Sequence, residues 1–169
     1  MLSHHPGIGN LLVFNGIVPT AIAPASGKLA GAFFLFPTPS GFSSTFKFSF
    51  PVTSVGAGAP RTARLHQAGG IVFPRGDRIV EITGLTLDLG RREMTGTVMA
   101  NRGPVGPRHL VLFHLDLSHL KVHGGRTEQI SGIGLNLTRD AARTLDHDLS
   151  TKIFTAGLDF GAASSTLHG

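Results

Sequence analysis

The sequence predicts an all-β fold: an antiparallel β-sandwich, or a closed barrel, with one short α-helix late in the chain. Short runs rich in Val, Ile, Leu, Phe and Thr alternate with turn residues, and the 169 residues include 23 Gly and 10 Pro. Helical periodicity occurs once, after Thr138, so strands and helices do not alternate as they do in α/β proteins. A chain of this length is expected to form one β-rich domain, residues 1–169, with 1–10 and 162–169 at its periphery.

The central stretch, Arg78–Val122, carries the clearest strand pattern. It holds three runs separated by turn residues: Ile79–Leu89, Met94–Ala100 and His109–Val122, the last being the longest strand-like segment of the chain. Because successive side chains of a strand point to opposite faces, the apolar residues of this last run are expected toward the core. The core-facing set is Val111, Phe113, Leu115 and Leu117, and the opposite set is His114, Asp116 and Ser118.

Three further strands are expected between the N-terminus and residue 52. Leu11–Val18 is expected as a first strand at a sheet edge, and Lys28–Phe36 as a continuous apolar strand. Ser44–Val52 alternates strictly between apolar and polar residues, so its aromatic side chains form a ladder on one face. Core filling is the favoured role of this ladder, and an apolar ligand slot is the alternative. The ladder consists of Phe46, Phe48 and Phe50.

The remaining elements follow from turns and capping residues. Two short strands are expected within 61–73, and another at Gln129–Leu137. Thr138 is a good N-cap for a short amphipathic helix packed on the sheet, and Lys152–Ala163 is expected to hold a last short strand. The apolar face of the helix is Ala141, Leu145 and Leu149.

Composition excludes several classes of function. The chain has no Cys, so disulfides and thiolate metal sites are ruled out, and it has no Tyr, so a tyrosinate ligand is ruled out too. Its net charge of +5 comes mostly from Arg in turns, whereas the 12 Phe fall in apolar alternation, which argues against stacking on nucleic acid. Gly16 and Pro19 interrupt the N-terminal apolar run, so no transmembrane segment is expected, and a signal peptide is expected to be absent or removed.

No catalytic set is expected, and the chain is predicted not to be an enzyme. His114, Asp116 and Ser118 share one strand face, but alternate residues of a strand stand ~6–7 Å apart, too far for a Ser–His–Asp relay. The Gly-x-Ser-x-Gly elbow is missing, and the Gly-Gly pairs lack the Lys-Ser/Thr of a phosphate-binding loop.

Histidine is the residue type left to carry ligand chemistry. His119 and His123 lie near the end of the long predicted strand and could supply a nitrogen to a metal or to haem iron. Lys121 between them opposes a cation, so a solvated strand end is the favoured interpretation and no metal site is predicted.

The stretch from Phe46 to Asp146 contains, in order, FKFSFPV, HQAGGIVF, VEITGLTLDLGRREMTGTV, LFHLDLS and GIGLNLTRDAARTLD. This pattern resembles a group of secreted or cell-surface actinobacterial β-sandwich domains, of which the nearest named group is the HtaA-type haem-uptake domain. The resemblance implies an extracytoplasmic, non-enzymatic module with haem as a candidate cofactor. HtaA-type domains are similar in ligating haem iron through a Tyr, which this chain lacks. The resemblance places His66, just before Gly69, near the glycine-rich histidine motif of that family.

Two functions therefore stay open. The first is an extracytoplasmic structural or interaction module that associates with itself, or with a cell-envelope partner, through exposed strand edges. The second is the binding of haem, or another small apolar anion, through His66, His119 or His123. The dense strand content and the lack of a catalytic set favour the first.

Overall fold

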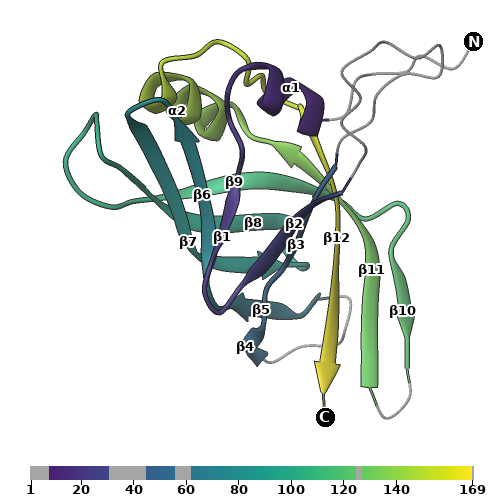
Figure 1. The fold of residues 1–169 in the computed structure, drawn as a ribbon. Coiled ribbons are helices and arrows are strands. Elements are labelled where there is room, and N and C mark those ends of the chain that lie inside the picture. The colour runs from purple at the N-terminus through teal and green to yellow at the C-terminus, as the bar shows by residue number, and fades with distance from the viewer. Residues whose placement is uncertain (1–7, 31–44, 56–61, 125–126, 169) are drawn as a thin grey trace, which may run out of the picture.

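The architecture is that of a computed structural model, which describes residues 8–30, 45–55, 62–124 and 127–168. One large antiparallel sheet curls around the core, a two-stranded sheet lies beside it, and two helices lie together at one end (Figure 1). The predicted all-β antiparallel class is confirmed. The described residues add a second helix, near the N-terminus, to the single late one that was expected.

The strands of the large sheet are β1 (Thr20–Ile22), β4 (Val52–Val55), β5 (Arg64–Gln67), β6 (Gly70–Arg75), β7 (Arg78–Asp88), β8 (Glu93–Ala100), β9 (Arg108–Asp116), β10 (Lys121–His123), β11 (Thr127–Leu137) and β12 (Asp159–His168). They run in the order β1-β6-β7-β8-β9-β11-β10, with β12 on β11 and with β5 between β4 and β7. The small sheet pairs β2 (Ser26–Ala30) with β3 (Thr45–Ser49).

The central runs form the middle of the large sheet, but the expectation of one long third strand is wrong. β9 ends at Asp116 and β10 begins at Lys121, and between them the Leu120 N–H donates to the Leu117 carbonyl at 3.1 Å. Both pieces pair with β11 on the side that β12 leaves open. β9 and β10 therefore occupy the same position in the sheet, next to β11, and are separated by a turn.

Glycines bend the two longest inner strands. Gly84 in β7 has φ +59° and lies where the register with β8 shifts, and Gly132 in β11 has φ +75° and lies where the register with β12 shifts. A residue in this left-handed conformation at a bulge bends its strand and increases its twist. These two bulges help to curl the sheet around the core.

The N-terminal segment is helical, so the expected first strand at Leu11–Val18 is wrong. Helix α1 (Ile8–Phe14) packs on the core through Leu12 and the partly buried Ile8 one turn before it. It ends in a Schellman motif, because the Ile17 N–H donates to the Leu12 carbonyl at 2.9 Å and Gly16 takes φ +72°. Asn-Gly here ends a helix instead of breaking a strand.

The other early predictions are met in part. Lys28–Phe36 overlaps β2, and residues 31–44 lie outside the described part. The run Ser44–Val52 is divided between β3 and β4. Of the aromatic ladder, Phe50 packs against the core, and the other two side chains lie outside the description. The two short strands expected within 61–73 are β5 and β6.

The late helix and the strand before it are present as predicted. Helix α2 (Arg139–Leu149) follows β11, and the Thr138 hydroxyl accepts a bond from the Ala141 N–H at 3.1 Å. The same hydroxyl donates to the Val111 carbonyl of β9 at 2.7 Å, so it ties the helix to the sheet. The buried apolar face of α2 is Ala141, Ala142, Leu145 and Leu149.

The last strand is longer than predicted and lies later in the chain. A short strand was expected within Lys152–Ala163, whereas β12 has ten residues and pairs with β11 as far as His168. The peripheral placement of 162–169 and the single-domain organisation remain predictions.

The two roles of Thr138 predict a measurable loss on its substitution. Thr138→Ala removes the helix cap and the bond to β9, so we expect the free energy of unfolding to fall by about 1–2 kcal/mol. Urea denaturation measures this change. Thr155→Ala, at an exposed loop position, is the control and should leave the midpoint unchanged; an equal effect of both variants contradicts the capping role.

Candidate functional site

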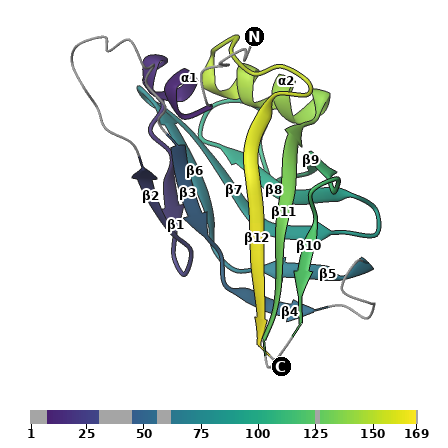
Figure 2. The same ribbon diagram turned by 90° about the vertical axis from the view of Figure 1, so that its right-hand side faces the viewer.

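The long outer edge of β12 is the first candidate site. β12 pairs with β11 over its whole length, and in the described part of the chain no strand pairs with its other edge (Figure 2). Its sequence, DFGAASSTLH, has no Lys, Arg or Pro, the residues that commonly protect an edge. At the opposite end of the strand order, β1 and β4 have only three and four residues. β12 is therefore a long, small-residue edge suited to pairing with a further strand.

The side chains of β12 divide into two faces. Ser165 is buried and Ala163 is half-buried, whereas Ala162 and Ser164 are exposed. The inward face carries aromatic packing, since the Phe160 ring lies 5.1 Å from that of Phe113, centroid to centroid. One face of β12 thus packs on the core, and one edge pairs with β11. The other edge carries small side chains and faces outward.

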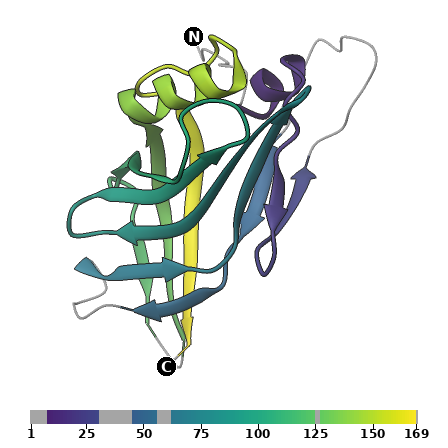
Figure 3. The same ribbon diagram turned by 90° about the vertical axis from the view of Figure 1, so that its left-hand side faces the viewer.

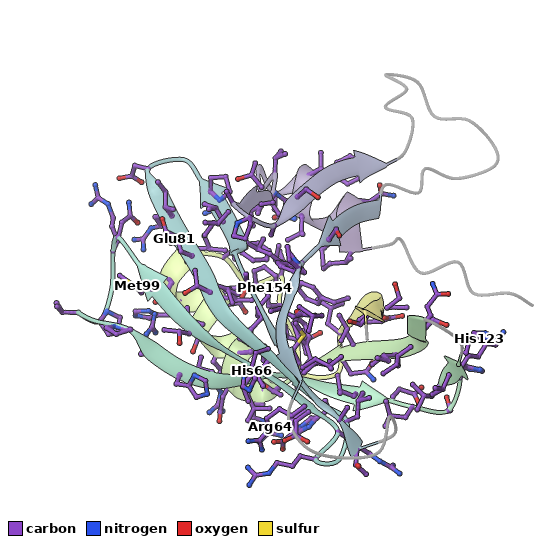
Figure 4. All side chains as sticks on the ribbon, turned by 90° about the horizontal axis from the view of Figure 1, so that it is seen from below. Arg64, His66, Glu81, Met99, His123 and Phe154 are labelled. Carbon is purple, nitrogen blue, oxygen red and sulfur yellow. The ribbon has the colours of Figure 1, made fainter. Side chains whose placement is uncertain are left out.

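The outer face of β5 carries the second candidate site, His66. Its neighbour Leu65 is fully buried, so the alternation of the strand turns His66 outward, as Figure 4 shows. The ring Nδ1 lies 3.0 Å from the hydroxyl of Thr86, the residue opposite it on β7. The next residue across the sheet is Thr95 on β8. This contact fixes the orientation of the His66 ring on a threonine-rich face.

An ion pair lies on the same face, two residues from His66. Arg64 Nε and Nη2 donate to Asp88 Oδ2 at 3.0 and 2.7 Å, and the Arg91 N–H donates to Asp88 Oδ1 at 2.8 Å. Burial of Asp88 raises its pKa, but the Arg91 N–H and the Arg64 guanidinium outweigh burial and hold the pKa below its usual range. The pair ties β5 to the end of β7 and leaves a cationic guanidinium, 48% exposed, on this face.

The structure does not bring the three predicted histidines together. His119 lies in the turn after β9 and His123 in β10, both exposed, and Figure 4 shows His123 well away from His66. Among the described residues, no group of three His, Asp or Glu is placed to hold a metal ion. Each histidine therefore remains a separate predicted ligand.

On the face of β9 that carries His114 and Asp116, the aspartate forms a hydrogen bond with the backbone. Asp116 Oδ1 accepts a bond from the Ser118 N–H at 2.9 Å, and this bond lowers the pKa of Asp116. The carboxylate thus stabilises the turn that separates β9 from β10.

A cluster of arginines at the end of α2 was missed by the sequence analysis, which placed most of the arginines in turns. Arg75 donates to the Leu149 and Ser150 carbonyls at 3.0 and 2.8 Å. Arg78 donates to the Asp148 carbonyl at 3.1 Å, and Arg108 pairs with the fully buried Asp148 carboxylate. Arginines satisfy the free carbonyls and the negative dipole at a helix C-terminus. The sequence places Arg75, Arg78 and Arg108 just outside predicted strands, but that these strand ends lie beside the helix is known only from the structure.

Comparison with known proteins gives a fold but no sequence family. No family model matches the chain, and no curated protein matches it. The C-terminal domain of HtaA from Corynebacterium glutamicum matches with a TM-score of 0.56 and 16% identity, over 94% of this chain and 91% of that one. The chain resembles the HtaA C-terminal domain in fold. A histidine-to-alanine variant of that HtaA domain, a domain-swapped dimer, matches with a TM-score of 0.53 and 17% identity, over 99% and 96% of the two chains.

The HtaA-like fold confirms the distant resemblance expected from the sequence between Phe46 and Asp146. Within the described residues, no helix is long and apolar enough to cross a bilayer.

The lowered pKa of Asp88 predicts how stability depends on pH. A carboxylate with a depressed pKa stabilises the fold above about pH 4, and this contribution is lost as the pH falls through its folded-state pKa. Asp88→Asn should therefore lower the urea midpoint at pH 7 and flatten its decline on acidification. Asp77→Asn, at an exposed surface pair, is the matched control. Parallel pH profiles for wild type and Asp88→Asn would rule out this role.

Proposed function

We propose that this domain is a non-catalytic, extracytoplasmic interaction module that associates with a second copy of itself through β12. The observation that carries the proposal is the ten-residue edge of β12, which has no strand partner within the described residues. Main-chain hydrogen bonds along such an edge supply affinity, and an antiparallel pairing of two identical edges closes a twofold dimer.

The charges and sizes along β12 suit an antiparallel pairing with a second copy. A register centred on Ala162 places Ala162 of one copy opposite Ala162 of the other and Gly161 opposite Ala163, because in a twofold antiparallel pair the central residue faces its own copy. Asp159 then lies opposite Ser165, and the strand carries no other charge between these two residues that would repel its partner. The small side chains of Gly161 and Ala162 permit close approach.

The comparison supports the same direction. A variant of the HtaA C-terminal domain forms a domain-swapped dimer, so a protein of this fold exchanges structure between two copies. Domain swapping exchanges an identical element between two copies, so a domain of this fold is able to associate with itself.

A charge placed on the β12 edge tests the proposal. Ala162→Lys introduces a cation at an exposed edge position and, in the twofold register, sets two like charges close together, so we expect the dimer to weaken by at least roughly ten-fold. Sedimentation equilibrium over a range of protein concentrations measures the dissociation constant. Met99→Lys adds the same charge on β8, which is paired on both sides, and should leave association unchanged.

Two results would contradict the self-association proposal. One is a wild-type protein that stays monomeric at every concentration. The other is a dimer that Ala162→Lys and Met99→Lys affect equally. Thermal melting of each variant alone shows that the monomer fold is retained.

The HtaA likeness favours a second function, the binding of haem or another small apolar anion. With no Tyr in the chain, a histidine nitrogen is the available counterpart of the ligand implied by the resemblance. His66 has its ring oriented by Thr86, and Arg64 on the same face can meet a carboxylate of the ligand. His66 is thus suited to ligate iron, and Arg64 to pair with an anionic group of the ligand. The described residues beside the His66 ring are threonines, however, and they supply no apolar slot. Haem binding is therefore second to self-association.

A haem titration with histidine variants tests this second function. We expect a saturable Soret shift for wild type and the loss of that shift for His66→Ala, because the axial nitrogen is removed. His119→Ala and His123→Ala are matched controls on exposed positions and should titrate as wild type does. A non-saturating response of the wild type, or indifference at all three positions, would remove haem binding from the account.

A further inference from the structure

Three separate segments meet around the last turn of α2. Arg75 bridges the ends of the two helices, since its guanidinium donates to the Asn15 carbonyl at 3.2 Å as well as to the Leu149 carbonyl at 3.0 Å. The β8–β9 loop reaches the same turn at Gly103, where a Cβ would lie 2.9 Å from Asp148 Oδ1. The end of α1, the end of α2 and this loop therefore form one end of the molecule (Figure 3).

Two large apolar side chains project from this end. Phe14, next to Asn15, is 82% exposed, and Val105, two residues beyond Gly103, is fully exposed. Pro104 and Gly106 flank Val105 at the tip of a loop that is exposed from residue 101 to residue 107. A single exposed apolar residue needs no explanation, but two at projecting positions on the same end indicate a surface that meets an apolar phase.

Cations line the outer face of α2 beside these tips. These cations are Arg139 and Arg143, which lie four residues apart and are both exposed, on the side of the helix away from its buried apolar face. Lys152, just after the helix, is exposed as well. Arg102, in the loop that carries Val105, is 58% exposed and pairs with Asp77. This end therefore presents cations together with apolar tips.

We propose that the helix-bearing end is a docking surface for an anionic lipid bilayer. Phe14 and Val105 enter the interfacial region of the bilayer, while Arg139, Arg143 and Lys152 lie among the phosphate head groups. An anionic polymer in solution would meet the cations equally well, but it would leave both apolar tips in water. The combination favours a lipid surface as the occupant.

This docking surface is distinct from the β12 edge. β12 runs from the helix-bearing end to the opposite end of the molecule, where the chain terminates (Figure 1). A domain seated on a bilayer through its helices thus keeps the length of β12 available to a second copy. The lipid inference does not depend on self-association.

Vesicle flotation with charge variants tests the proposal. The wild-type chain is mixed with phosphatidylcholine vesicles in which roughly a third of the lipid is phosphatidylglycerol, and with phosphatidylcholine vesicles alone. We expect binding to the anionic vesicles only, and a roughly 25-fold lower partition coefficient for Arg139→Gln/Arg143→Gln, about five-fold per cation removed. Arg91→Gln/Arg92→Gln removes the same charge from the β7–β8 turn, at the other end of these strands, and should bind as wild type does.

Apolar variants separate a bilayer from a soluble polyanion. Phe14→Ser/Val105→Ser keeps every charge, and we expect it to bind anionic vesicles at least about ten-fold more weakly, because apolar burial in the interface is lost. Its affinity for a soluble polyphosphate should equal that of wild type. Full vesicle binding by this variant, or equal losses for the two pairs of arginine variants, would overturn the proposal.

Discussion

The left-handed backbone conformation of two glycines, Gly84 in β7 and Gly132 in β11, is the constraint on which the rest of the structure depends. Along one side, β7 pairs first with β6 and then with β5. In the same way, one side of β11 is shared by β9 and β10. Each of these two long strands has its bulge near the point where its partner changes. At Gly132 a Cβ would overlap the His119 carbonyl oxygen, so only glycine allows the close approach of the β9–β10 turn. The resulting curl encloses the core but does not close the sheet, which leaves β12 as a long edge.

The helices and their arginines complete the enclosure at one end. Burying Asp148 requires a cation, and Arg108 from β9 provides it, while Arg75 and Arg78 occupy the carbonyls that end α2. The guanidinium groups of these three arginines are therefore engaged in bonds within the fold. The cations that face solvent, along the outer side of α2, are a separate set with a separate use. The net charge of +5 thus divides into structural charges and charges available to a partner.

Local patterns were enough to predict much of this fold. Runs of β-branched and leucine residues bounded by turn residues identified β7, β8 and β11, and the N-cap Thr138 identified α2, because each signal lies within a few neighbouring residues. The break after Asp116 depends on the contact between Gly132 and His119, which are distant in sequence, and α1 depends on a Schellman end at Gly16. Pairing of Arg108 with Asp148 likewise arises only when two elements meet. Candidate histidines could be named from sequence, but their separation on the surface could not.

Hydrogen–deuterium exchange of the β12 amides at low and high protein concentration tests the central claim most directly. An open edge that pairs with a second copy predicts that part of the β12 amides exchange quickly in dilute solution and become protected as concentration rises, while β7 amides stay unchanged. If the β12 amides exchange at one rate at all concentrations, whether fast or slow, the edge is not the site of association and the account is wrong.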